Sequence, residues 1–378
     1  MRIVDLFSGA GGLTFGFYYS KENDKFIKNK SCNIIFANEY DTAAAKSFCT
    51  NFPDINMLNQ DIRNLTEEKI MGLIGEEEVD LIIGGPPCQS YSTVGRRVYD
   101  DKAKLYNEYY RVLSIVKPRM FLFENVKGML SMKDEKGNFV IDNIKKMFAN
   151  INENLGYNIV YDIIDAVSYG IPQHRERVFI IGIRNDLNIE WNFNYLEKEL
   201  EQLTLKEAIS DLPPISSGED IRIYGSIPEN DYQRLMRGDN IELSGHFLSV
   251  YGNRIQTIMN NVIQGEGKDY INSLVDKGIL EEEYRLTSGY KNTYGRLYAN
   301  QPCTTITNNM STPSGLRCIH YEQNRALTPR EGARIQSFPD WFKFIGNKKE
   351  IKVQIGNAVP PLLAMKFAEQ LEKVLGER

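Results

Sequence analysis

The sequence predicts an α/β protein: a mostly parallel sheet with helices on both faces, plus a smaller irregular domain. Two observations support this. Short apolar runs at residues 3–7, 34–37, 81–83 and 120–123 alternate with helical stretches, an order typical of βαβ units. After Arg184 the chain is rich in Asn, Gly, Tyr and Ser and holds only short helical patterns.

Each element has its own local signal. The four apolar runs end in polar residues or glycine, as buried strands do, and Pro118 ends the third helical stretch. We expect helices over residues 42–52, 67–74, 105–116 and 141–155.

Two further signals of regular structure follow these helices, one before Arg184 and one near residue 370. The β-rich stretches 158–167 and 177–183 lie close together in sequence, so we expect them to form an antiparallel edge of the sheet. Between residues 363 and 375, apolar residues recur at spacings of three and four. This spacing predicts a terminal helix that packs on the main domain.

Composition excludes several classes of protein. A chain of 378 residues, 42% of them hydrophobic, can bury a large core and is not wholly disordered. No apolar run approaches the roughly 20 residues that span a bilayer, and Asp5 interrupts any signal sequence. The five scattered cysteines include no CxxC pair, which argues against disulfides and a cysteine-rich zinc site. We therefore expect a soluble, cytoplasmic protein without a metal.

The loops after the first three strands suggest an adenosine-containing cofactor. Gly9, Gly11 and Gly12 let a ligand approach the backbone near a helix N-terminus. Glu39 could accept hydrogen bonds from ribose hydroxyls. Its alternative role is to cap the following helix, which Asp41 could do equally well. Asp61 could bind an adenine amino group or cap the next helix. No single loop is decisive, but together they favour the cofactor.

The loop at residues 84–90, Gly-Gly-Pro-Pro-Cys-Gln-Ser, is more specific. Its prolines stiffen a turn that places Cys88 at the edge of the sheet where ligands bind. Glu124 ends the next strand, and the run 173–177 supplies arginines that could lower the pKa of the Cys88 thiol. The sequence therefore predicts a nucleophilic cysteine beside a carboxylate.

At these residues the chain resembles the DNA (cytosine-5) methyltransferases, which use S-adenosylmethionine. The chain departs from the family pattern in two small ways. Tyr91 stands where phenylalanine is frequent in that family, and His174 fills the open position of the family's Gln-x-Arg-x-Arg pattern. Neither difference replaces a residue that the family uses in catalysis. The matching segments occur in the family's order: DLFSGAGG (5–12), NEYD (38–41), QDI (60–62), GGPPCQSYS (84–92), ENV (124–126), QHRERVF (173–179), RALTPREGARIQSFPDW (325–341) and QIGNAVPP (354–361).

The resemblance implies a Rossmann-like class I methyltransferase domain formed by residues 1–184 and 345–378. Residues 185–344 would then be the target-recognition domain. It also implies a covalent mechanism in which the Cys88 thiolate adds to cytosine C6 and activates C5. The implied catalytic residues are Cys88, Glu124, Arg175 and Arg177, with Glu124 at ring N3 and Arg177 at the ring oxygen.

The same resemblance implies the binding residues. Phe7 and Asp61 would contact the adenine, Glu39 the ribose, and the backbone at Gly9 and Gly11 the methionine end. The remaining cofactor contacts would be Pro87, Leu105, Asn357 and Val359. The implied DNA contacts are Ser90, Ser92, Arg96, Arg97 and Gln173 near a flipped-out cytosine, and Arg296 and Arg317 as readers of base edges.

The implied partner is double-stranded DNA, and we expect a monomer that belongs to a restriction–modification system with a possible cognate endonuclease. Two alternatives remain at this stage: a transfer-RNA cytosine-5 methyltransferase, and a non-catalytic DNA-binding protein on the same fold. A nicotinamide-dependent oxidoreductase is disfavoured, because the first glycine loop lacks the GxGxxG spacing.

Overall fold

A seven-stranded sheet forms the centre of the computed structural model, which describes residues 1–87, 104–152 and 155–376. The first five strands in the spatial order given below are parallel to one another. The last two pair antiparallel, as the sequence predicts. In spatial order the strands are β5 (Asn56–Asn59), β4 (Asn33–Glu39), β1 (Arg2–Leu6), β6 (Leu81–Gly84), β7 (Met120–Val126), β9 (Glu176–Arg184) and β8 (Tyr157–Asp165).

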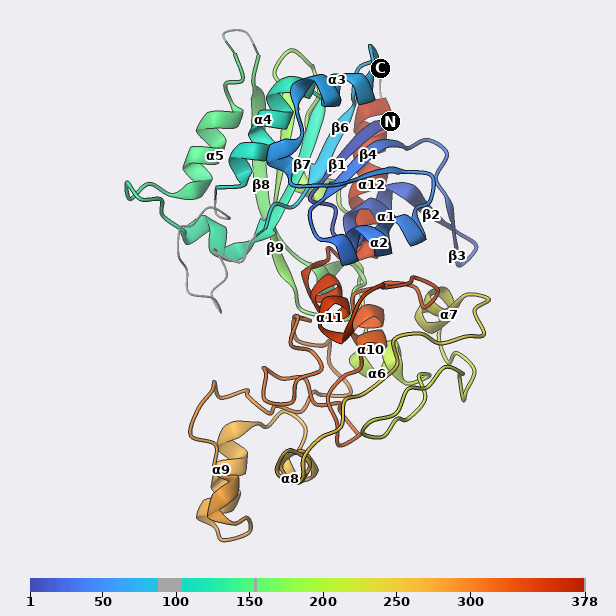
Figure 1. Cartoon of the computed structure of the whole chain (residues 1–378), viewed down its shortest axis with the longest axis vertical. Coiled ribbons are helices and arrows are strands. Elements are labelled where there is room, and N and C mark those ends of the chain that lie inside the picture. Colours follow the sequence, from blue (N-terminus) through green and yellow to red (C-terminus); the bar gives the residue numbers. More distant parts are fainter. Residues whose placement is uncertain (88–103, 153–154, 377–378) are drawn as a thin grey trace.

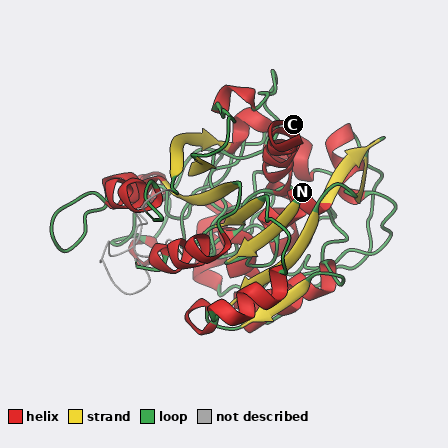
Figure 2. Cartoon of the chain, turned by 90° about the horizontal axis from the view of Figure 1, so that it is seen from above, coloured by secondary structure: helices red, strands yellow, loops and turns green. Residues whose placement is uncertain are grey.

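Helices cover both faces of this sheet (Figure 2). Alternate strand residues point to opposite faces, so Ile3 and Leu122 join one apolar cluster while Val4 and Phe121 join the other. The first cluster contains α1 (Gly12–Tyr18), α2 (Thr42–Asn51) and α12 (Pro361–Gly376). The second contains α3 (Glu67–Ile74), α4 (Tyr106–Val116) and α5 (Val140–Phe148).

Two local elements differ from the sequence prediction. α5 ends at Phe148 rather than at residue 155, because the chain turns back and the amide of Ile151 donates to the carbonyl of Leu155. A hairpin, β2 (Tyr19–Glu22) and β3 (Lys25–Lys28), was not predicted. Its turn residues Asn23 and Asp24 both have positive φ, the conformation that two-residue hairpin turns require.

After β9 the described residues contain short helices and isolated bridges but no further strand of the main sheet, which matches the predicted change in texture. The helices are α6 (Leu205–Ile209), α7 (Asp231–Arg237), α8 (Asn253–Asn261), α9 (Lys268–Asp276), α10 (Pro329–Ile335) and α11 (Lys348–Asn357). Short 3-10 turns lie at Ile62–Asn64, Lys127–Ser131, Ala166–Tyr169, Phe193–Tyr195 and Glu282–Tyr284.

The main apolar core extends across the predicted domain boundary at 184/185. Leu205, Ile306 and Phe338 belong to the same buried cluster as Phe367 of α12. A separate small cluster, which includes Ile258 and Leu274, lies around α8 and α9. These two helices lie at the end of the molecule farthest from both termini (Figure 1). The lobe with a core of its own is therefore smaller than the predicted domain of residues 185–344.

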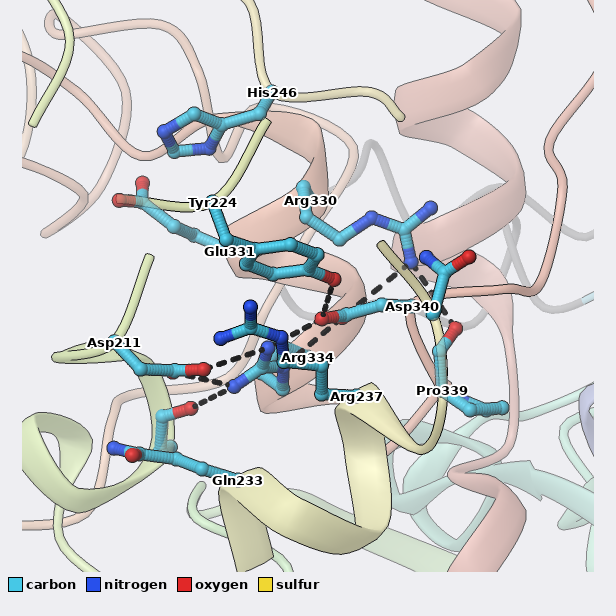
Figure 3. Close-up of polar contacts among 12 residues, drawn as sticks. Asp211, Tyr224, Gln233, Arg237, His246, Arg330, Glu331, Arg334, Pro339 and Asp340 are labelled. Carbon is cyan, nitrogen blue, oxygen red and sulfur yellow. Dashed lines mark hydrogen bonds and ion pairs between the residues drawn. The ribbon is translucent and has the colours of Figure 1, made fainter. Parts of the chain in front are cut away.

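Buried ion pairs join α10 to the segment around α6 and α7 (Figure 3). Arg334, fully buried, donates to Asp211 at 2.8 Å and to Asp340 at 3.0 Å. The hydroxyl of Tyr224 donates to Asp340 at 2.6 Å. Arg330 donates to the carbonyls of Ser244, Pro339 and Phe342. Charged groups without water need such partners, so these contacts fix α10 against the segments before and after it in the second half of the chain.

No helix in the described part of the chain is both long and apolar enough to span a membrane.

Candidate active site and nucleic-acid interface

Glu124 and Arg177 form an ion pair at the carboxyl edge of the parallel strands. β7 and β9 are antiparallel, with Glu124 opposite Phe179 and Arg177 opposite Val126. The two charged residues are therefore diagonal neighbours across the strand pair, within reach of long side chains. Arg177 Nε lies 3.2 Å from Glu124 Oε1, and both side chains are largely buried. The sheet register thus brings together two residues that are 53 positions apart by their numbers.

Burial dominates the electrostatics of Glu124. The residue is 8% exposed, and loss of solvation raises the pKa of Glu124, although the positive charges of Arg177 and Arg175 oppose this rise. A Cβ atom at Gly85 would lie 2.8 Å from Glu124 Oε2, so glycine lets the carboxyl group rest on the backbone after β6. Glu124 is therefore a carboxyl group that retains a proton more readily than an ordinary glutamate.

The loop after β6 is fastened to the same strand end. Asn125, 1% exposed, donates from Nδ2 to the carbonyl of Pro86 at 3.2 Å. Sequence reasoning did not single out this asparagine, although it follows Glu124 directly. Pro87 is the last described residue of the loop. The predicted Cys88, Ser90, Ser92, Arg96 and Arg97 lie outside the described residues.

Arg175 packs between distant parts of the chain. It is 1% exposed and donates to the carbonyls of Ile306, Gly356 and Ala358. These bonds tie the start of β9 to the end of α11 and to the segment after Cys303. Its positive charge also opposes the rise in the pKa of Glu124. A catalytic contact between Arg175 and the substrate stays a prediction.

Glu39 organises the opposite end of the edge. Its Oε2 accepts from the amide of Gly9 at 2.8 Å, and its Oε1 accepts from the amide of Asp41 at 2.7 Å. Burial raises the pKa of Glu39, while these amide donors favour its charged form. Asp41 caps α2 through the amide of Ala44. The structure therefore assigns the cap to Asp41 and leaves Glu39 to join the first two loops.

The first loop is shaped for close approach by a ligand. Phe7, Gly9 and Gly11 all have positive φ, and nothing lies within 4 Å of a Cβ built on Gly9. The carbonyl of Val359 lies 2.4 Å from the position of a Cβ at Gly12. The C-terminal segment thus packs beside the first loop, with Asn357 exposed next to it.

Asp61 and Leu105 lie at the neighbouring strand and helix ends. Asp61 caps the 3-10 turn that follows β5 and pairs with Arg63, whose Nη2 donates at 2.6 Å. The bond from Arg63 lowers the pKa of Asp61. Leu105 directly precedes α4 and packs, with Phe7, against the second apolar cluster. One edge of the sheet therefore holds every described residue that was predicted to bind the cofactor.

Asp5 is a buried acidic residue that sequence reasoning did not single out. It is fully buried in β1, accepts from the hydroxyl of Thr14, and its Oδ1 has no hydrogen-bond partner among the described residues. Burial raises the pKa of Asp5 to about 8. A buried charge without a full set of partners is costly, so this carboxyl group retains a proton more readily than an ordinary aspartate. The polar residue inside an apolar strand was the available signal.

Two predicted DNA contacts are corrected by the structure. Gln173 is fully buried, donates to Ile335 and Gln336 and accepts from the amide of Ile306. Arg296 is 5% exposed, and its guanidinium makes bonds with the carbonyls of Val262, Met259, His320 and Gln323 and with Asn324 Oδ1. These five bonds use all five donors of an arginine. Neither residue can read DNA from this position.

Arg317 is the predicted reader that the structure leaves partly exposed. Its guanidinium carbon lies 5.7 Å from the centre of the Tyr298 ring.

Comparison with known proteins gives a consistent family. The family model described as C-5 cytosine-specific DNA methylase matches residues 1–373. The Type II methyltransferase M.DdeI of Desulfomicrobium norvegicum is 34% identical, covering 98% of this chain and 88% of the relative. M.NgoPII of Neisseria gonorrhoeae is 33% identical, covering 99% and 96%.

A solved structure agrees over the full length. A prophage-encoded E. coli protein, described as a DNA modification methyltransferase, superposes with a TM-score of 0.76 at 26% identity and 100% coverage of both chains. The Dnmt2 methyltransferase of S. pombe, at 16% identity and a TM-score of 0.59, shares the fold. With motifs in order, the carboxylate–arginine pair in place and a family match across the chain, this protein belongs to the C-5 cytosine-specific DNA methylases.

Proposed function

We propose that this chain is the modification enzyme of a bacterial restriction–modification system. In this role it methylates C5 of one cytosine within a specific sequence of double-stranded DNA. The observation that carries the proposal is the buried Glu124–Arg177 pair, 3.2 Å apart, beside the loop that leads to Cys88. The relatives named Type II methyltransferases support it, and they favour DNA over transfer RNA as the substrate.

The proposed chemistry begins with the Cys88 thiolate. Its sulfur forms a bond to cytosine C6, and the electron pair of the C5–C6 double bond moves toward N3, where Glu124 supplies a proton. C5 is then nucleophilic and takes the methyl group, while the bond between that methyl group and the sulfonium sulfur breaks to leave S-adenosylhomocysteine. The N3 proton returns to Glu124, a base takes the C5 proton, and the bond between the Cys88 sulfur and C6 breaks, which restores the aromatic ring and releases the Cys88 thiolate. Arg177 would donate to the ring oxygen while negative charge develops.

The methyl donor would bind along the sheet edge. S-adenosylmethionine supplies an electrophilic methyl group when it is bound. Glu39 would hold the ribose, Phe7 and Asp61 the adenine, and the backbone at Gly9 and Gly11 the methionine end. Pro87, Leu105, Asn357 and Val359 would complete the pocket. The open space above Gly9 supports this fit.

The substrate base must leave the duplex before Cys88 can reach it, at a cost of a few kcal/mol. Ser90, Ser92, Arg96 and Arg97 belong to the segment proposed to close over it. We propose further that the enzyme acts as a monomer in the bacterial cytoplasm, and that a cognate endonuclease cuts the same unmethylated sequence.

The decisive experiment offers S-adenosylmethionine with a tritiated methyl group, together with unmethylated plasmid DNA or transfer RNA, to the purified chain. We expect label in the DNA, and bisulfite sequencing should place it at one cytosine of a recurring sequence. Cys88→Ser should abolish transfer. The matched variant Cys49→Ser, which changes an exposed thiol on α2, should behave as the parent does.

Other outcomes separate the alternatives. Label in transfer RNA but not in DNA would identify the transfer-RNA enzyme. DNA binding without transfer, under conditions where S-adenosylmethionine binds, would identify a non-catalytic protein on this fold.

A further inference from the structure

Arg317 differs from the other arginines in its partners. Every other arginine in the described ranges donates to a carbonyl or carboxylate oxygen of the protein. Among the described residues the guanidinium of Arg317 has neither a hydrogen bond nor an ion pair, and its one charged-group contact is the face of Tyr298 at 5.7 Å. Its donors are therefore available to a partner outside the described residues.

The backbone holds this pair firmly. The amides of Cys318 and Ile319, just after Arg317, both donate to the carbonyl of Gly295, and the amide of Leu297, just before Tyr298, donates to the carbonyl of Ile319. Cys318 Sγ also donates to the carbonyl of Thr312, which precedes Arg317. The two residues therefore project from paired segments rather than from a free loop.

Two glycines make room for the side chains. A Cβ at Gly295 would lie 3.0 Å from both Cβ and Cγ of Arg317, so the stem of the arginine rests directly on that glycine. A Cβ at Gly265, where φ is +81°, would lie 1.9 Å from the hydroxyl oxygen of Tyr298. Larger residues at either position would displace the pair. The close packing leaves the ring and the guanidinium few alternative positions.

The paired segments are connected to the active-site edge. Thr304 Oγ1 donates to the carbonyl of Arg317 at 3.3 Å. Its neighbours are bonded to the run before Arg177: the amide of His174 donates to Cys303, and Thr305 Oγ1 donates to the carbonyl of His174 at 2.6 Å. Short covalent and hydrogen-bonded links therefore join Arg317 to the strand that carries Arg177.

We propose that Tyr298 and Arg317 form one base-reading element, with Tyr298 as the residue that positions the guanidinium. An aromatic face orients the guanidinium plane and reduces the side-chain entropy lost on binding. An oriented guanidinium fork matches O6 and N7 of a guanine in the major groove. The pair therefore reads one guanine of the methylated sequence. This inference rests on the proposed function, because it requires duplex DNA as the substrate.

The test replaces each guanine of the methylated sequence, one at a time, with 7-deazaguanine, which lacks only the N7 acceptor. For the parent enzyme, kcat/KM should fall about 5- to 50-fold at one guanine. Arg317→Ala should be slower on the normal duplex and should not distinguish guanine from 7-deazaguanine at that position. Tyr298→Phe should retain the discrimination, whereas Tyr298→Ala should lose most of it.

Two measurements make the outcome specific. Arg222→Ala, which removes an exposed arginine paired with Asp220, should keep both the rate and the discrimination. Calorimetric binding of S-adenosylmethionine should be equal in all variants.

Other results would overturn the proposal. If Arg317→Ala weakened all DNA sequences equally and reduced the salt dependence of binding, Arg317 would contact a phosphate. If Tyr298→Ala kept full discrimination, the positioning role would be wrong. Both results require an active parent enzyme. A parent that bound S-adenosylmethionine but did not methylate duplex DNA would instead refute the proposed function and this inference with it.

Discussion

Glu124 illustrates how single residues obtain their chemistry from their surroundings. Burial raises the pKa of this carboxyl group, and the nearby cations Arg177 and Arg175 lower it. If Glu124 gives a proton to the cytosine ring, activity requires its protonated form. The activity should then be present below its pKa and decline as the pH rises through it.

This reasoning predicts the effect of Arg177→Met. Removing the positive charge that lies 3.2 Å from Glu124 leaves only Arg175 to oppose the effect of burial. The pKa of Glu124 should therefore rise further. The alkaline decline of activity should move to higher pH, even though the rate itself falls. The measurement is the pH profile of single-turnover methylation. Lys127→Met, which removes an exposed cation paired with Glu176, is the control and should leave the profile in place. A decline that moved to lower pH would contradict the assignment.

A second prediction concerns Glu124→Gln. The amide keeps the size of the side chain and can still donate a hydrogen bond, but it cannot transfer a proton. We expect methyl transfer to fall by about 10²- to 10⁴-fold. The affinity for S-adenosylmethionine should change little, because Glu124 lies at the β7 end of the edge and Glu39 at the β4 end. Rapid-quench kinetics and calorimetry measure the two quantities. Equal losses of both would indicate damage to the fold instead.

At the scale of elements, α10 joins two segments of the second half of the chain. It begins with a capping box in which Thr328 accepts from the amide of Glu331 and Glu331 accepts from the amide of Thr328. Further along, Arg334 neutralises Asp211 and Asp340, which come from before and after the helix. All three residues are almost inaccessible to solvent. Much of the stability of this junction therefore depends on charges that have no access to water.

Arg334→Met should accordingly destabilise the protein strongly. It leaves the buried carboxyl group of Asp211 without its cation and leaves Asp340 with only the cation of Arg330, 3.9 Å away, a change that costs about 3–5 kcal/mol. Urea denaturation measures the free energy of unfolding. Arg234→Met is the matched control, because Arg234 pairs with Asp231 on the exposed face of α7, where such pairs contribute about 0–1 kcal/mol. Similar losses in the two variants would show that the buried network contributes little.

At the scale of the whole molecule, buried ionisable groups link stability to pH. Burial lowers the pKa of His320 from 6.5 to about 3. In the folded protein, Nδ1 of His320 accepts hydrogen bonds from the amides of Glu322 and Gln323, each at 3.1 Å. Protonation of Nδ1 would therefore break both hydrogen bonds. Between pH 6.5 and 3 the unfolded chain therefore binds a proton that the folded chain excludes.

The sign follows directly: His320 favours the folded state above pH 6.5, and this contribution is lost as the pH falls toward 3. One proton corresponds to a slope of about 1.4 kcal/mol per pH unit. His320→Gln should reduce the slope of unfolding free energy between pH 6 and 4 by up to about that amount. The slope above pH 7 should not change, since the histidine is neutral in both states there. An unchanged slope at acid pH would contradict the buried neutral histidine.

The separate core around α8 and α9 leads to a prediction about specificity. Exchanging residues 251–298 with the corresponding segment of a relative that methylates another sequence should change the methylated sequence at positions other than the guanine assigned to Arg317, which lies outside the exchanged segment. The larger exchange of 185–344 should unfold the protein, because Leu205, Ile306 and Phe338 belong to the main core. Bisulfite sequencing and thermal denaturation measure the two outcomes. A stable chimera of 251–298 that methylated the original sequence would place the readers elsewhere.

The sequence alone predicts the sheet, the flanking helices and the edge where the site lies. These features depend on local patterns, because apolar runs specify buried strands and the carboxyl ends of parallel strands meet at one edge. Glu124, Glu39 and the glycines of the first loop were identified in this way. The unpredicted hairpin at β2 and β3 has only four-residue strands, which are too short for a clear alternating pattern.

Only the tertiary structure separates the arginines and glutamines by role. In the sequence, Arg296 and Arg317 are equivalent candidates, 21 positions apart by their numbers. In the fold, Arg296 meets carbonyl groups from Val262 and His320 that use its donors, whereas Arg317 meets an aromatic face that leaves them available. Gln173 likewise meets Gln336, 163 positions away. The physical reason is that a donor is free or satisfied according to acceptors brought near it by chain folding, and these acceptors leave no local signal in the sequence.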